Sequence, residues 1–159
     1  MEKIIVDIEK FVLFHKNRVL LLKEFANNKV HGRMIFQVSF LGFESLAKLL
    51  YPKMKSRERF IELLSIPNMG ITKEEATLLY ENWRNSLVHQ GFIATPWTCL
   101  ESWSKYDINF LSYSDNKVRA STEFPPESII SIYKSRIDYL EDFYKKTNTT
   151  EVEFNSLNQ

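Results

Sequence analysis

Three polar residues in the stretch LYENWRNSLVHQG, from Leu79 to Gly91, have the chemistry needed to cut a phosphodiester bond. They are Arg84, Asn85 and His89. Near neutral pH an imidazole can take a proton from a ribose 2′-hydroxyl or return one to the leaving oxygen. A guanidinium can hold the charge that grows on the phosphoryl oxygens, and Asn85 is in reach to orient the imidazole or the phosphate. The set suits RNA cleavage without a metal.

An amphipathic helix is expected to position these residues. Thr72 and Glu75 form a capping-box pattern at its start, and Gly91 is well placed to end it. At about 100° per residue, its core face comprises Ala76, Leu79, Tyr80, Trp83 and Leu87, and the polar residues fall on the opposite arc. Arg84 and His89 diverge by roughly 140°, so one copy cannot easily bring both onto one phosphate. A two-fold dimer with two such helices face to face would supply two of each across a shared groove.

A solvated surface is the simplest account of a polar helix arc. Leu78 and Val88 nevertheless lie within this arc, and a mixed apolar and polar face is typical of interfaces. We therefore expect a partner surface to cover it.

The rest of the chain predicts an all-α fold, an up-and-down helical bundle with a small β-hairpin before the last helix. Apolar periodicity and breaking residues give helices at about residues 2–26, 33–51, 56–65, 72–91 and 126–147. The second helix is apolar on most sides, which suits the centre of a bundle. Alternation in VRASTEF favours a hairpin from about Ile108 to Phe124. We expect one domain over residues 1–147 and a polar, disordered tail over 148–159.

Further polar residues have two interpretations each. Lys53, Lys55 and Arg57, with Arg59 beyond them, could hold RNA phosphates, although a solvated loop explains them equally well. Glu44 could pair with Arg84, but pairing with Lys48 one turn further on is simpler.

Histidines and aromatic residues outside the motif favour structural roles. His15 lies in the apolar stripe of the first helix, as a hydrogen-bonded core histidine would. The aromatic side chains near the hairpin could stack on bases, but pinning that segment to the bundle is the favoured role; they are Trp97, Trp103, Tyr106, Phe110 and Tyr113. No two histidines have metal-ligand spacing, so neither a metal nor another cofactor is expected.

Composition indicates a globular protein whose net charge is close to zero. The net charge is +1, so bulk electrostatics neither supports nor excludes RNA. The single Cys99 fits a reducing compartment. The start, MEKIIVDIEK, interleaves charges with apolar residues, unlike a signal peptide, and no uncharged apolar run approaches the roughly 20 residues of a membrane span. A cytoplasmic protein is the expectation.

The stretch RNSLVHQG resembles the signature of HEPN domains, small helical bundles. Their motif is an Arg, usually followed by a polar residue such as Asn, with four to six residues in all before a His. Four residues separate Arg84 from His89, and Asn85 fills the polar position. The order of helices is similar over roughly residues 1–147. HEPN toxins paired with nucleotidyltransferase antitoxins carry a Tyr two residues after the His, where this chain has Gly91.

The resemblance implies a homodimer formed through the motif helices and, often, a metal-independent endoribonuclease of toxin or other defence systems. Its partners would be an RNA substrate and an antitoxin or regulatory protein. Two alternatives remain. The first is a non-catalytic HEPN-like module that binds a protein partner or a nucleotide through the same groove, and the second is a structural subunit of a larger assembly.

Overall fold

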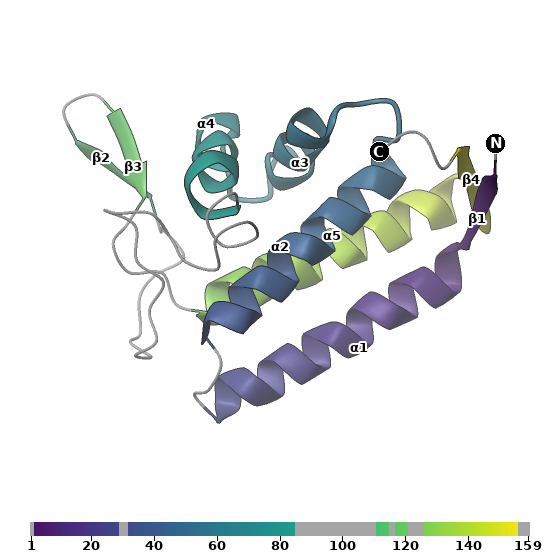
Figure 1. Ribbon diagram of the computed structural model, residues 1–159, viewed down its shortest axis with the longest axis horizontal. Coiled ribbons are helices and arrows are strands. Elements are labelled where there is room, and N and C mark those ends of the chain that lie inside the picture. Colours follow the sequence, from purple (N-terminus) through teal and green to yellow (C-terminus); the bar gives the residue numbers. More distant parts are fainter. Residues whose placement is uncertain (1, 29–31, 85–110, 115–116, 121–125, 156–159) are drawn as a thin grey trace.

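The computed structural model is mostly helical, and it describes residues 2–28, 32–84, 111–114, 117–120 and 126–155 (Figure 1). The helices are α1 (Ile8–Asn27), α2 (Gly32–Leu50), α3 (Ser56–Leu64), α4 (Lys73–Leu78), the π-helical turn η1 (Leu79–Arg84) and α5 (Pro126–Lys146). The strands are β1 (Lys3–Asp7), β2 (Leu111–Ser114), β3 (Lys117–Ala120) and β4 (Glu151–Asn155).

The three long helices α1, α2 and α5 pack against one another, with α3 and α4 beyond α2 (Figure 1). Buried side chains of α2 occupy the centre, among them Ile35, Phe36, Phe40, Phe43 and Leu46. The ring of Phe43 meets those of Phe60 in α3 and Tyr133 in α5 edge-on, with centroids 6.1 and 5.7 Å apart. The central position expected for the second helix is therefore confirmed.

Two α5 side chains donate to backbone carbonyls in the last turns of α2 and α3. Tyr144 donates its hydroxyl to the Leu49 carbonyl (2.8 Å), and the buried Arg136 donates to the carbonyls of Leu63 (3.1 Å) and Leu64. Such carbonyls have no partner within their own helix. Burial lowers the pKa of Arg136 to about 10, so it stays protonated at neutral pH. These bonds fix the ends of α2 and α3 against α5.

A buried polar pair joins α1 to α5. His15 Nδ1 is hydrogen-bonded to the Tyr133 hydroxyl, and both side chains are buried, which confirms His15 as a core histidine. Burial, with the positive charge of Arg18 as a second cause, lowers the pKa of His15 to about 4. Burial also raises the pKa of Tyr133 to about 12. Gly42 of α2 packs so closely here that a Cβ would clash with the ring of Tyr133.

Both ends of the expected domain differ from prediction. The first helix does not begin at residue 2, because residues 3–7 form β1 and Asp7 caps α1 by accepting from the Lys10 backbone N–H (3.0 Å). The tail expected to be disordered contains β4, which pairs antiparallel with β1. Val152 and Phe154 alternate with exposed glutamates and pack on the core, a period of two that suits a strand. Residues 156–159 lie outside the described residues.

The turn between α5 and β4 explains how the chain returns to β1. Asn148 adopts a left-handed conformation (φ 51°), its N–H donates to the Lys145 carbonyl, and the Thr149 N–H donates to the Tyr144 carbonyl. This is a Schellman motif, which satisfies late helix carbonyls and redirects the chain.

The expected hairpin and capping box are both confirmed. Strands β2 and β3 pair antiparallel from Leu111↔Ala120 to Ser114↔Lys117, inside the predicted range, and β3 contacts α4. Thr72 and Glu75 make both bonds of the capping box at the start of α4. Among the described residues, no helix is long and apolar enough to cross a membrane.

Candidate functional site

The motif helix changes geometry before it reaches the motif. α4 ends at Leu78, and Leu79–Arg84 form the π-helical turn η1, in which the hydrogen-bond repeat lengthens from four residues to five. Arg84 therefore lies nearer the side of the buried Leu79 than an α-helix would allow. The expectation that Arg84 faces the opposite arc was wrong for this reason. Single π turns are frequent at functional sites.

Contacts with α2 and with the Tyr80 ring help to hold Arg84 in place. Its Nη2 forms an ion pair with Glu44 Oε1 of α2, and its guanidinium carbon lies 5.2 Å from the centroid of the Tyr80 ring. The Arg84 side chain is 11% exposed and that of Glu44 20% exposed. The simpler pairing of Glu44 with Lys48 is not the one observed, because Lys48 lies over the Phe154 ring instead. Arg84 is thus oriented by contacts rather than loosely solvated.

Arg84 opens onto a hollow of about 340 Å³ between α1, α2, α3 and η1. The described residues give its lining four cationic side chains and one carboxylate, with two hydroxyls and one apolar side chain; they are Arg18, Leu41, Glu44, Ser45, Lys48, Ser56, Arg59 and Arg84. An excess of positive charge in a concave site attracts anions. We call this site the basic hollow.

The structure brings together only part of the predicted site. Arg84 lies in the basic hollow, whereas Asn85 and His89 lie outside the described residues. Lys53 and Lys55 are exposed and do not line the hollow. Arg57 pairs with Glu81 (2.6 Å), so its charge is already matched.

Sequence reasoning missed Arg18 and Lys48 and gave Arg59 only a minor place. Each of these residues stands on a different helix, so their spacing along the chain carries no signal. Arg59 offers one clue in retrospect, since it falls two residues from Arg57 and therefore faces a different side of α3. That side is buried.

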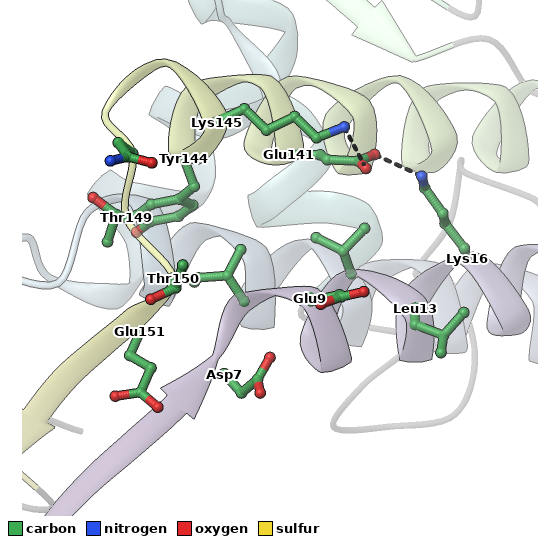
Figure 2. A pocket seen from close by; sticks show the side chains of 13 residues that line it. Asp7, Glu9, Leu13, Lys16, Glu141, Tyr144, Lys145, Thr149, Thr150 and Glu151 are labelled. Carbon is green, nitrogen blue, oxygen red and sulfur yellow. Dashed lines mark hydrogen bonds and ion pairs between the residues drawn. The ribbon is translucent and has the colours of Figure 1, made fainter.

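A larger hollow of about 640 Å³ lies where β1 runs into α1 and α5 runs into β4 (Figure 2). Figure 2 shows Lys16 of α1 and Lys145 of α5 both reaching Glu141, at 2.6 and 3.0 Å. Their hydrogen bonds hold the pKa of Glu141 below its usual value. The lining carries four carboxylates and two lysines, so it would repel a phosphate. The smaller basic hollow is the better candidate for anion chemistry.

Among the described residues, no group of three or more His, Cys, Asp or Glu is placed to hold a metal ion. Comparison of the chain with protein-family models, with curated proteins and with solved structures finds no match in any of the three.

Proposed function

We propose that this protein is a metal-independent endoribonuclease of the HEPN type that acts as a homodimer, with Arg84, Asn85 and His89 in its active site. The observation that carries the proposal is the setting of Arg84. The motif arginine lies in a concave site with three other cations, oriented by Glu44 and by the Tyr80 ring. A solvated surface arginine would need none of these contacts.

In the proposed reaction the ribose 2′-oxygen attacks the adjacent phosphorus, and the bond from phosphorus to the 5′-oxygen breaks. One His89 takes the proton of the 2′-hydroxyl, and the second His89 of the dimer gives a proton to the 5′-oxygen. Arg84 stabilises the charge on the phosphoryl oxygens, because it is positioned before the reaction begins. Asn85 orients the imidazole or the phosphate. The products are a 2′,3′-cyclic phosphate and a 5′-hydroxyl.

Dimerisation through the motif helices supplies the second histidine. Leu78, at the end of α4, is half-buried within one chain and offers apolar surface next to η1 that a second copy would cover. In a defence or toxin setting, an antitoxin or regulatory protein would bind the same face and block the groove.

A non-catalytic module that binds a nucleotide through the same hollow is the second candidate. It is favoured by the four cationic side chains that line the basic hollow within the described chain. The two functions depend on different residues of the motif. Catalysis requires His89, whereas binding alone tolerates its loss far better than the loss of Arg84.

The deciding experiment is cleavage of a mixed RNA substrate in EDTA by the wild-type protein, His89→Ala and the matched control His31→Ala. Dimerisation of all three is measured by analytical ultracentrifugation. We expect wild type and His31→Ala to cut RNA and His89→Ala to be a folded, inactive dimer. A dimeric wild-type protein that leaves RNA intact across pH 6 to 8 would refute the nuclease and favour the binding module.

A further inference from the structure

Three cations of the basic hollow have no carboxylate partner among the described residues. Arg18 lies over the Phe14 ring, with 4.6 Å from its guanidinium carbon to the centroid, and Lys48 lies over the ring of Phe154 at 5.5 Å. Arg59 forms no ion pair within that part of the chain. Glu44, the carboxylate that the described residues contribute to the lining, pairs with Arg84. Within the described chain, three positive charges of the hollow therefore have no carboxylate partner.

Arg59 gives the clearest sign that the hollow suits a hydrogen-bond acceptor. The residue is 8% exposed, and its Nε is buried without a hydrogen-bond partner among the described residues. A buried guanidinium N–H without an acceptor costs free energy, more than a neutral group would. Since Arg59 lines the hollow, an acceptor that enters there can satisfy it.

The N-terminus of α3 adds partial positive charge to the basic hollow. Ser56, the first residue of this helix, lines the hollow, and the preceding Lys55 makes no side-chain capping bond. The first backbone N–H groups of a helix have no partner within it and carry partial positive charge. A phosphate is the ligand that such N–H groups bind most readily, together with arginine and lysine.

We propose that the basic hollow is a phosphate-binding subsite, in which Arg18, Lys48 and Arg59 hold a phosphate group beside Arg84. The inference rests on the proposed function, since it names the group of the substrate that this site would hold: a phosphate of a single-stranded nucleic acid next to the one that is cleaved. Glu44 does not oppose the ligand, because its charge is already matched by Arg84. The subsite also replaces the exposed Lys53 and Lys55 as the phosphate contact nearest the motif.

The test measures binding without cleavage. The probes are a fluorescent tetranucleotide of 2′-deoxynucleotides, which lacks the attacking hydroxyl, and inorganic phosphate as its competitor. Affinities are measured by fluorescence anisotropy at several salt concentrations for wild type, Lys48→Gln, Arg18→Gln and Lys53→Gln. Lys23→Gln is the matched control, because Lys23 is exposed on α1 and does not line the hollow. Circular dichroism confirms that each variant is folded.

Loss of one phosphate contact should reduce the slope of log K against log salt by about 0.7, equivalent to about fivefold weaker binding at 0.1 M salt. We expect this from both hollow variants and no change from Lys23→Gln. Binding of inorganic phosphate, measured by calorimetry and weakened in both hollow variants, with no binding of the tetranucleotide would also support the subsite, but would assign it to a small phosphate ester.

Three results would overturn the proposal. They are the absence of binding to either probe, wild-type slopes in both hollow variants, and a loss confined to Lys53→Gln, which would place the phosphate on the loop before α3. Each is independent of nuclease activity. A tetranucleotide bound through the hollow by a protein that does not cut RNA would preserve the subsite and refute the nuclease.

Discussion

The buried pair of His15 and Tyr133 predicts how the stability of this protein depends on pH. The pKa of His15 is lowered from 6.5 to about 4 in the folded chain, whereas an unfolded chain leaves it at its ordinary value. Between these two values the unfolded state binds a proton that the folded state does not. The stability that neutral His15 contributes is therefore fully present above pH 6.5 and is lost as the pH drops toward 4.

The magnitude follows from the difference in pKa. The fall in the pKa of His15 from 6.5 to about 4 corresponds to about 3 kcal/mol of unfolding free energy. This is a large part of the 5–15 kcal/mol that stabilises a typical domain. We therefore expect the free energy of unfolding to fall by about 3 kcal/mol between pH 7 and pH 4 through His15 alone.

Urea unfolding of wild type and His15→Gln at half-unit intervals from pH 7.5 to pH 4 isolates this contribution. Glutamine does not titrate and keeps an amide that can bond to the Tyr133 hydroxyl. The other two histidines, His31 and His89, are present in both proteins and cancel in the difference. The two stability curves should converge by about 3 kcal/mol as the pH falls. Curves that stay parallel over the whole range would refute the buried, neutral His15.

Three further substitutions test the packing and the site. Gly42→Ala should lower the free energy of unfolding, measured in urea, by about 1–3 kcal/mol, because the new Cβ meets the buried Tyr133 ring. The higher helix propensity of alanine offsets up to about 1 kcal/mol of this loss. Arg136→Met should lower it by about 2–5 kcal/mol, since two buried carbonyls of α3 lose their donor. Glu44→Gln removes a carboxylate from the lining of the basic hollow, which makes the hollow more positive, so it should tighten tetranucleotide binding in anisotropy.

Each of these has a result that would contradict it. A Gly42→Ala protein as stable as wild type would show that the ring can move at little cost. Unchanged stability in Arg136→Met would mean that water replaces the arginine at α3. Weaker tetranucleotide binding by Glu44→Gln would show that orienting Arg84 matters more than the charge of the hollow.

Local patterns made the helices and the hairpin predictable. Pro52 and the Thr72 and Glu75 box mark boundaries that depend on neighbouring residues only, and alternation from Val118 onward marks β3. The first strand was missed because Ile4 and Ile8 are four residues apart, a spacing that fits a helix equally well. Only pairing with β4, nearly the whole chain away, decides between the two.

The site was predictable in part, for a different physical reason. The Arg84 motif is local, so its residue types were visible in the sequence. The orientation of Arg84 was not visible, because a π-helical turn has no distinctive residue that marks it in the sequence. The π turn nevertheless changes the side of the helix on which Arg84 lies. The basic hollow combines Arg18, Lys48 and Arg59 from three helices, and each of these looks like an ordinary surface cation until the bundle brings them together.

The pairing of β1 with β4 also has a mechanical consequence. Lys3 lies opposite Asn155, and Asp7 lies opposite Glu151, so the outer ends of the two strands meet at the same end of the ladder. A force applied through the segments before β1 and after β4 would load one pair at a time and open the ladder like a zipper. The strands would separate at low force, and the load would then pass to the first turn of α1 and the last turn of α5.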